Sequence, residues 1–345
     1  MELKEFMYEL PRSLIAAYPS AERAEARLMV VRRNTGELFH SDFSELGKFL
    51  DAGDLLVLND TRVFPARLRG VKESGGKVGV LLLEPFLSWV DHWIALIDAA
   101  KRPQVGSRLF FSAGVYAQVI GDLGEGRYGI RFHTQGDFLE HLERLGEPPI
   151  PRYIHRTREA SPLDWERYQT VYAYDPGAVA APTAGFHFTP ELLERLESRG
   201  VDRTFLTLHV GPGTFQPVRA EVVERHRMEG ERYRIKAGVA EKIDRTKRSG
   251  KRVVAVGSTT TRALEWVARL KGKVEAAEGI TRLFIRPGEP FLVIDGLITN
   301  FHLPGSTPLI LVAAFAGLDL VRRAYQEAIR LQYRFYSYGD AMLIL

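Results

Sequence analysis

The stretch RVVAVGSTTTRALEWVARLKG, residues 252–272, decides the fold of this chain. Its first part, RVVAVGS, is a short apolar run rich in valine, which predicts a buried strand. Gly257 and three threonines follow, and apolar side chains then recur at a helical period up to Gly272, where we expect the helix to end. A strand that turns through a glycine directly into a helix is the repeating unit of α/β folds.

The same alternation of strand and helix extends on both sides of this stretch. Helices are predicted by DWERYQTVYA, TPELLERLESRG, AGVAEKIDRTKRSG, TPLILVAAFAG and LVRRAYQEAIRLQ, and strands by RTFLTLHVG and PFLVIDGLITNF. Near the N-terminus, SDFSELGKFLDAGD predicts a capped helix ended by Gly53, and LLVLND predicts a buried strand. This order predicts an α/β domain with largely parallel strands.

A different texture interrupts the alternation between residues 67 and 151. KVGVLLLEPF, HWIALIDA, SRLFFS, VYAQVI and RYGIRFH are short apolar or alternating runs separated by Gly-rich turns, which is typical of a small antiparallel barrel or sandwich. LLVLND, before this segment, is a continuous apolar run like the strands predicted after it. We therefore expect a discontinuous α/β domain at 1–66 and 152–345, with a β-rich domain inserted at 67–151.

The composition narrows the chemistry. The chain has 345 residues, 45% of them apolar and 26% charged, as in ordinary soluble globular proteins. No signal-peptide core or run long enough to span a bilayer is apparent, so we expect a cytoplasmic protein without a membrane partner. The absence of cysteine excludes disulfides and thiolate chemistry. No HxH or HExxH spacing predicts a metal site, and no GxGxxG or P-loop predicts a nucleotide cradle.

Several stretches place polar side chains where strands are expected to end. They are LNDTRVFPARL (58–68), APTAGFHFT (181–189), TLHVGPGTFQPV (207–218), AVGSTTTRALE (255–265) and ITNFHLPGSTP (298–308). Ligands of α/β domains gather at such transitions, and a helix N-terminus with free amides and hydroxyls suits a carboxylate or phosphate. The alternative is that the histidines are core residues and the threonines are ordinary helix caps. Together the stretches indicate an α/β enzyme with a pocket lined by His, Thr and Asn.

Two clusters of basic residues differ in character. PRYIHRTR (151–158) mixes arginines with a tyrosine after a Pro-rich segment, which favours contacts with phosphates or nucleotides as much as a solvated surface. EKIDRTKRSGKR (241–252) is more typical of the solvated end of a helix. The net charge of +4 is compatible with a polyanionic partner but does not require one.

Six motifs in register resemble the S-adenosylmethionine:tRNA ribosyltransferase-isomerase family of queuosine biosynthesis. They are LNDTRVFPARL, GAVAAPTAGFHFT, TLHVGPGTFQPV, RVVAVGSTTTRALE, ITNFHLPGSTPLILVAAFAG and YRFYSYGDAMLI. The resemblance implies a barrel-like α/β catalytic domain with an inserted small antiparallel β-barrel. It also implies transfer and isomerisation of the ribosyl unit of S-adenosylmethionine, a co-substrate, onto 7-aminomethyl-7-deazaguanine at the wobble position of tRNA with a GUN anticodon. Epoxyqueuosine, adenine and methionine would be the products, with no further cofactor and no metal.

The resemblance also suggests roles for individual residues. For proton transfer we expect His187 and His209, with Asp60 and His302 in reserve. Further candidates for binding the substrates are Arg62, Thr183, Phe186, Phe188, Thr259, Thr260, Thr261, Thr299 and Asn300. Of these, the two phenylalanines are expected to stack on a base, although Phe188 fits a core position equally well, the threonine run to hold the methionine carboxylate, and Thr299 and Asn300 to bind sugar hydroxyls. Candidates for tRNA contacts are Arg152, Tyr153, Arg156 and Arg158.

Two positions depart from the family pattern. The family usually has HxMHxE after the GPGTF motif, whereas HRMEGE here has Glu229 in place of the second histidine, so we expect no essential proton transfer at that position. Ser258 replaces the first of four threonines and keeps a hydroxyl. The competing interpretations are a non-catalytic RNA-binding protein and an S-adenosylmethionine-dependent tRNA methyltransferase. No coiled-coil pattern argues for assembly, so a monomer is expected.

Overall fold

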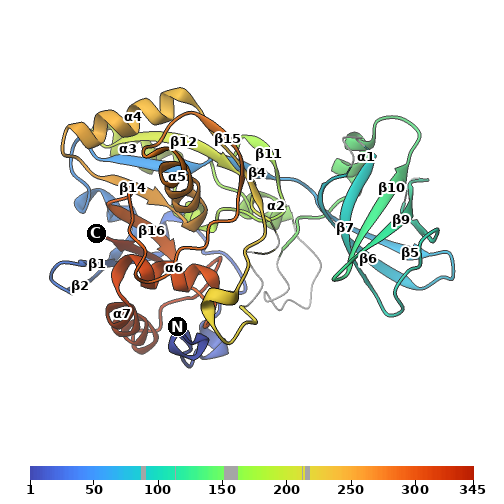
Figure 1. The fold of residues 1–345 in the computed structure, drawn as a ribbon, viewed down its shortest axis with the longest axis horizontal. Helices are drawn as coiled ribbons and strands as arrows, with labels where there is room; N and C mark the ends of the chain where they lie inside the picture. The colour runs from blue at the N-terminus through green and yellow to red at the C-terminus, as the bar shows by residue number, and fades with distance from the viewer. Residues whose placement is uncertain (87–90, 113, 151–161, 212, 214–217) are drawn as a thin grey trace.

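The computed structural model describes all residues except 87–90, 113, 151–161, 212 and 214–217. Two lobes are visible in Figure 1: a large α/β lobe that contains both chain termini, and a smaller lobe of strands. The expected α/β domain with an inserted antiparallel β-barrel is therefore confirmed. The domain boundaries themselves stay a prediction: the first barrel strand begins at Arg67, and the downstream boundary lies outside the described residues.

The large lobe is built on one mixed sheet with the strand order β15-β13-β12-β3-β14-β16-β17-β1-β2. The strands are β1 (Arg27–Val31), β2 (Leu38–Asp42), β3 (Leu55–Asn59), β12 (Asp202–Leu208), β13 (Glu231–Ile235), β14 (Val253–Val256), β15 (Ala277–Thr281), β16 (Gly296–Asn300) and β17 (Ala341–Ile344). The central strands β12, β3, β14 and β16 are mutually parallel. Antiparallel pairs flank them, so the sheet is less uniformly parallel than predicted, and it is an open sheet with β15 and β2 at its edges.

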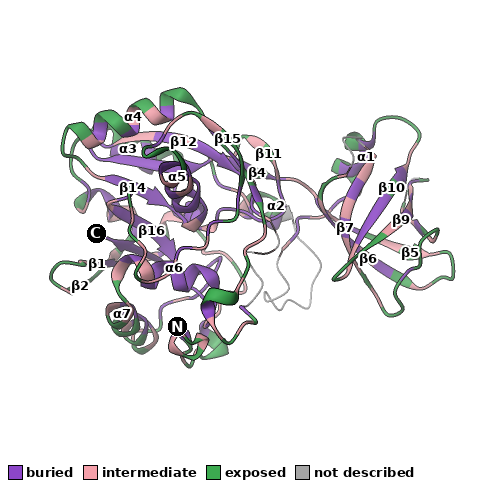
Figure 2. Cartoon of the chain, in the orientation of Figure 1, coloured by how far each residue is buried: buried purple, intermediate pink, exposed green. Residues whose placement is uncertain are grey.

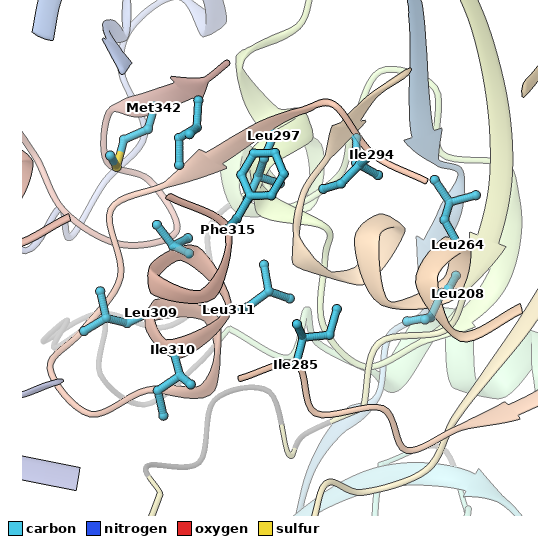
Figure 3. Close-up of a cluster of buried hydrophobic side chains, with 14 of the residues drawn as sticks. Leu208, Leu264, Ile285, Ile294, Leu297, Leu309, Ile310, Leu311, Phe315 and Met342 are labelled. Carbon is cyan, nitrogen blue, oxygen red and sulfur yellow. The ribbon is translucent and has the colours of Figure 1, made fainter. Parts of the chain in front are cut away.

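Helices cover both faces of this sheet because its buried strands carry apolar side chains on both sides. The helices are α2 (Pro162–Arg167), α3 (Pro190–Ser198), α4 (Ala237–Arg248), α5 (Ser258–Lys271), α6 (Thr307–Ala316) and α7 (Leu318–Arg330). Side chains of α4, α5, α6 and α7 share one core cluster with alternate strand residues such as Val57 and Leu297. Figure 3 shows part of this cluster, with side chains from α5, α6 and β16. Those of α3 pack on the opposite face, against Leu56 and Val254.

Two of the helices, α3 and α6, begin at a residue whose side chain caps them. Thr189 accepts a hydrogen bond from the backbone N–H of Leu192 at the start of α3, and Ser306 does the same for Leu309 at the start of α6. Gly257, before α5, has a φ of 89°, and Gly272, after it, has a φ of 80°. Both values favour glycine, which explains why the strand turns into α5 and why α5 ends at these two positions.

The smaller lobe is a closed antiparallel barrel with the strand order β10-β7-β6-β5-β8-β9. Its strands are β5 (Arg67–Lys72), β6 (Lys77–Pro85), β7 (His92–Ala99), β8 (Arg108–Phe110), β9 (Tyr116–Gly124) and β10 (Arg127–His133), followed by α1 (Phe138–Leu145). Alternating side chains fill its interior, among them Val80, Trp93 and Ile130. Buried stretches of its strands are purple in Figure 2. A short parallel pair, β4 (Thr61–Val63) and β11 (Asp175–Ala178), lies beside the large sheet.

Some local predictions were wrong. SDFSELGKFLDAGD forms the 3-10 helix η4 (Phe43–Lys48) rather than an α-helix up to Gly53, and a glycine at position 47 weakens helical propensity there. The helix expected over DWERYQTVYA ends at Arg167, because Gln169 turns aside to hydrogen-bond both backbone groups of Val63. The remaining short 3-10 helices are η1 (Leu3–Phe6), η2 (Arg12–Leu14), η3 (Arg23–Glu25), η5 (Thr183–His187) and η7 (Val223–Arg225). Among the helices of the described residues, none has the length and apolar character needed to cross a membrane.

Candidate active site

The four parallel strands bring their carboxyl ends to one edge of the large sheet. β3 ends at Asn59, β12 at Leu208 and β16 at Asn300, while β14 leads into Gly257. Ligands of open α/β sheets bind outside this edge. The polar loop stretches predicted from the sequence therefore meet at the place where a ligand site is expected.

A cleft of about 50 Å³ opens at this edge, between η5, the start of α5 and the loop before α6. Five residues predicted from the sequence line it: Thr183, Thr259, Thr299, Asn300 and His302. Much of the rest of the wall consists of Ala181, Pro182, Gly257, Ser258, Tyr336 and Ser337. The cleft thus combines hydroxyl, amide and imidazole groups, which suit the polar parts of a nucleoside or amino acid.

His187 reaches the cleft through Asn300. The Nε2 atom of His187 lies 3.1 Å from Nδ2 of Asn300, and the Thr183 hydroxyl donates to Oδ1 of the same amide at 3.0 Å. An amide nitrogen only donates, so Nε2 accepts and the ring is neutral, with its hydrogen on Nδ1. Burial, followed by the charges of Arg334 and Arg23, lowers the pKa of His187 to about 3.

His302 lies in the cleft wall and is held on several sides. Its Nε2 atom is 2.7 Å from the Thr299 hydroxyl, and its backbone N–H donates to the Tyr325 hydroxyl at 3.0 Å. The Tyr8 hydroxyl donates to the His302 carbonyl oxygen. Burial lowers the pKa of His302 to about 3, so this ring is also neutral near pH 7.

His209 is half-buried beside the short β4–β11 pair and does not line the cleft. Its Nδ1 atom lies 2.9 Å from the Thr61 hydroxyl. Gly177 faces the ring, and a Cβ atom at that position would come within 2.7 Å of it. Burial lowers the pKa of His209, with Arg232 and Arg234 acting in the same direction and Asp175 opposing them.

Asn59 connects these groups, and the sequence analysis gave it no role. Its side chain is fully buried; Nδ2 donates to the Leu208 carbonyl at 2.9 Å and to the Thr259 hydroxyl at 3.2 Å. Its Oδ1 atom accepts from the backbone N–H groups of Leu208 and Thr61. Asn59 therefore ties β3 and β12 to the start of α5. An amide at the end of a buried strand was the available signal. Tyr336 and Ser337 also line the cleft, although the sequence indicated them only as part of the C-terminal motif YRFYSYGDAMLI.

Asp60, the next residue, is half-buried and accepts from the Thr207 hydroxyl at 2.7 Å. Burial raises its pKa, while the Thr207 hydrogen bond opposes this shift. Asp60 is not part of the cleft lining. Arg62, on β4, is exposed and also lies outside that lining.

The three threonines at the start of α5 are not equivalent. The Thr260 hydroxyl donates to the Val256 carbonyl at 2.8 Å, and the Thr261 hydroxyl donates to the Gly257 carbonyl at 3.1 Å. Both side chains are fully buried, whereas Thr259 lines the cleft. Of the three, only Thr259 lines the cleft; its hydroxyl accepts from Asn59, whereas the other two hydroxyls donate to backbone carbonyls.

The two phenylalanines beside His187 occupy different environments. Phe188 is fully buried between Phe43 and Tyr172, with ring centroids 5.0 and 6.4 Å away. Phe188 therefore packs as a core residue, which is the second of the two positions expected for it. Phe186 is also buried, and its ring stacks on Tyr338 with centroids 5.8 Å apart.

The predicted tRNA contacts Arg152, Tyr153, Arg156 and Arg158 lie outside the described residues. Within the described residues, no three His, Asp or Glu side chains are grouped so as to hold a metal ion.

A two-domain protein with an open α/β sheet, an inserted antiparallel barrel and a cleft of Thr, Asn and His side chains has the architecture of an enzyme acting on a polar ligand. The chain matches the family model described as queuosine biosynthesis protein over residues 3–344. The chain therefore belongs to this family.

Relatives and a solved structure agree with this assignment. The S-adenosylmethionine:tRNA ribosyltransferase-isomerase of Carboxydothermus hydrogenoformans is 51% identical over 346 residues, with 100% of both chains covered. The protein of the same name from Halothermothrix orenii is 50% identical over 347 residues, again with 100% of both covered. The crystal structure of S-adenosylmethionine tRNA ribosyltransferase from Thermotoga maritima is similar with a TM-score of 0.57 and 37% identity, covering 99% of this chain and 100% of that one.

Proposed function

We infer that this chain is an S-adenosylmethionine:tRNA ribosyltransferase-isomerase of queuosine biosynthesis. The observation that carries the inference is identity of about half over the full length of relatives with that name. The enzyme transfers the ribosyl unit of S-adenosylmethionine to tRNA and isomerises it, giving epoxyqueuosine. The acceptor we propose is 7-aminomethyl-7-deazaguanine at the wobble position of tRNA with a GUN anticodon, and the enzyme acts as a cytoplasmic monomer.

The reaction sets three demands on the site. The C5′ hydrogens of S-adenosylmethionine are acidified by the adjacent sulfonium, so a base removes one of them. Adenine leaves as the sugar opens, and its nitrogen takes up a proton. The aminomethyl nitrogen bonds to the opened sugar, the ring closes through C5′, and an alkoxide displaces methionine to form the epoxide. The site must therefore supply a base, an acid and shelter from water.

The cleft residues are proposed to bind S-adenosylmethionine. Thr259 and Ser258 line the cleft at the N-terminus of α5, and we propose that they hold the methionine carboxylate together with the backbone amides of the first helical turn. Thr183 and Asn300 are proposed to bind the sugar hydroxyls, with Thr299 acting through His302. Phe186 and Arg62 remain candidates for contacts with a base and with tRNA, as do Arg152, Tyr153, Arg156 and Arg158.

For proton transfer we propose a division of labour among the histidines. His209 is only half-buried, whereas His187 and His302 are buried rings whose pKa is lowered to about 3, so we propose His209 as the base, with Asp60 as the alternative. His187 and His302, neutral at pH 7, serve as hydrogen-bonding groups that fix Asn300 and Thr299. His187 accepts a proton only if the Asn300 amide releases its Nε2 atom.

A product assay tests the assignment. The protein is incubated with S-adenosylmethionine and tRNA that carries 7-aminomethyl-7-deazaguanine, and the products are identified by mass spectrometry. Adenine, methionine and the epoxide nucleoside together are expected. Release of S-adenosylhomocysteine would instead identify a methyltransferase, and tRNA binding without any release would identify a binding protein. Unmodified tRNA serves as the control, since it lacks the aminomethyl nucleophile.

A further inference from the structure

A second, smaller pocket lies next to the cleft and is lined by arginines. It encloses about 20 Å³ between η3, the end of α2 and the loop that precedes β17. Arg23 and Arg167 line it together with Ser20 and His187. Ser337 lines both this pocket and the cleft, so the two spaces are neighbours. A volume of this size holds one or two oxygen-sized atoms, which excludes a base or a sugar.

A third arginine stands behind the pocket. Arg334 donates to the Ser20 hydroxyl at 3.1 Å and to the carbonyl of Tyr18 at 2.8 Å. Arg23 donates to the carbonyls of Phe186 and Glu166. Arg167 donates to the carbonyl of Ala21. In the part of the chain that the structure describes, the hydrogen bonds of these guanidinium groups therefore run to neutral oxygens, and Glu166 is a carboxylate that acts on both Arg23 and Arg167.

Among the described residues, carboxylates offset the charge of this pocket only in part. The pocket lining contains no Asp or Glu among the described residues. Glu166 is 3.9 Å from Nε of Arg167, beyond hydrogen-bond distance, and its side chain is 74% exposed. Asp340 is occupied by Arg27 and by the backbone N–H of Arg334. The Nε atom of Arg167 is buried without a hydrogen-bond partner, although its side chain is only 13% exposed.

The positive charges of these arginines lower the pKa values of neighbouring groups in the same cluster. Burial and the neighbouring Arg167 lower the pKa of Arg23, and Arg334 and Arg23 contribute to the low pKa of His187. A buried cluster of like charges is unfavourable unless an anion joins it. An incoming oxyanion would accept hydrogen bonds from the planar forks of the arginines and relieve their repulsion.

We propose that this arginine pocket binds a phosphodiester group of the tRNA substrate, next to the nucleotide whose base enters the cleft. The proposal rests on the proposed function and adds the part of the site that receives the RNA backbone. The methionine end of S-adenosylmethionine fits less well, because its ammonium group would face the guanidinium groups of Arg23 and Arg167, and no carboxylate is among the described lining residues. A phosphodiester carries one negative charge and no positive one.

Two exposed aromatic residues lie on the segments that form the pocket. Tyr18, whose carbonyl accepts from Arg334, is 56% exposed, and Trp165, two residues before Arg167, is 40% exposed. Exposed aromatic rings beside arginines are typical of surfaces that bind unpaired RNA bases, because the bases stack while the phosphates are neutralised. An anticodon loop supplies both features.

The test measures tRNA affinity as a function of salt, without turnover, for the full chain and three variants. Arg167→Gln removes one guanidinium, Arg167→Lys keeps the charge, and Arg248→Gln removes a 79% exposed arginine from α4 as a matched control. We expect Arg167→Gln to weaken binding about tenfold near 0.1 M salt and to reduce the slope of log K against log[salt] by ~0.7, as for one lost single-strand phosphate contact. Arg167→Lys should keep most of the slope, and Arg248→Gln should keep all of it.

The KM for S-adenosylmethionine provides the second readout. It should stay unchanged in Arg167→Gln; a rise there with an unaltered salt slope would assign the pocket to the methionine carboxylate and overturn the proposal. No change in either quantity would make the arginines purely structural and also overturn it. If Arg167→Gln fails to fold, Arg23→Gln is measured in the same way. Because binding is measured directly, a wild-type protein that releases no adenine would refute the proposed function while leaving this test intact.

Discussion

The side-chain amide of Asn300 donates a hydrogen bond to Nε2 of His187, with 3.1 Å between the two nitrogens. The Thr183 hydroxyl fixes the orientation of that amide by donating to its oxygen. A chain of three side chains thus leads from the cleft to a buried, neutral histidine. The arrangement holds the cleft amide in one orientation, which a binding site for sugar hydroxyls requires.

His187 is expected to set the rate without titrating in the working range. Its pKa of about 3 means that it stays neutral from pH 5 upward. We expect His187→Gln to lower kcat about 100-fold, a typical effect of losing one positioned group in catalysis, while the acidic limb of the pH profile of kcat/KM stays in place. His209→Gln should instead remove that limb. A shift of the limb in His187→Gln would identify His187 as the titrating base.

His302 should make the protein sensitive to acid. Its pKa is lowered to about 3 in the folded protein from an ordinary value near 6.5, so the unfolded chain binds more protons between these values. The stabilisation is complete above pH 6.5 and is lost as the pH falls toward 3. From pH 7 to pH 5 the free energy of unfolding should fall by about 2 kcal/mol through this residue.

Denaturant unfolding at the two pH values checks the effect of His302. His302→Gln should be less stable than the wild type at pH 7, because the Thr299 hydroxyl loses its partner, yet should lose about 2 kcal/mol less on acidification. His40→Gln, on the exposed strand β2, is the control and should keep the full acid loss. An equal acid loss in the wild type and His302→Gln would show that another group carries it.

The sequence predicted the architecture well where patterns are strong. The βα unit at 252–272, the helices α3 to α7 and the inserted barrel all follow from hydrophobic period, capping residues and turn glycines. The edge and outer strands were missed. β2 and β15 carry few buried residues, and β17 is a short C-terminal run whose pairing with β1 and β16 is a long-range contact. Local pattern does not specify such pairing.

The sequence was sufficient to predict several residues that line the candidate site, but not the hydrogen bonds between them. Polar loops after strands were sufficient to select Thr183, Asn300 and His302, because parallel strands end at a common edge. The sequence could not distinguish Thr259 from Thr261, since the difference is the helical phase relative to the cleft. Nor could it show that Asn59 links three segments, because its partners lie more than a hundred residues away.

The threonine run offers a test of that difference. Thr259→Val removes the hydroxyl of a residue that lines the cleft and accepts from Asn59, so we expect the KM for S-adenosylmethionine to rise about tenfold. Thr261→Val removes a hydroxyl that bonds only to the Gly257 carbonyl and should leave this KM within about twofold while costing up to ~1 kcal/mol of stability. Steady-state kinetics and thermal unfolding of both variants make the comparison. Equal KM values for the two would remove Thr259 from the proposed substrate site.

Glu229, where the resemblance led us to expect a histidine, pairs with Arg127 of the barrel strand β10. The ion pair therefore joins the two domains. Each side chain is 30% exposed, so the pair is expected to add less than ~1 kcal/mol to stability. We expect Glu229→Gln and Arg127→Gln each to have this small effect, and a double-mutant cycle to give a coupling energy below ~1 kcal/mol.

The larger consequence of the Glu229 pair should concern tRNA. Loss of the pair loosens the barrel relative to the cleft, so the KM for tRNA should rise a few-fold while the KM for S-adenosylmethionine stays constant. Glu229→His, the family residue, should behave like Glu229→Gln at pH 8, where an exposed imidazole is uncharged. A strong loss of kcat in Glu229→Gln would instead indicate a role for this carboxylate in the reaction.

The absence of a side chain at Gly177 should be necessary for the observed position of the His209 ring. Its φ of 152° disfavours other residues, and a Cβ atom would lie 2.7 Å from Cε1 and Nδ1 of His209. The ring would have to leave the Thr61 hydroxyl, which lies 2.9 Å from Nδ1. If His209 is the base, Gly177→Ala should lower kcat at least about tenfold, since a small displacement of a catalytic group is costly.

Gly238→Ala is the matched control. It lies in α4 with nothing within 4 Å of the added Cβ, and it should preserve turnover while raising stability by about 0.5–1 kcal/mol. Full turnover in Gly177→Ala, with the ring displaced in its crystal structure, would exclude His209 as the base and return the choice to Asp60 and His187.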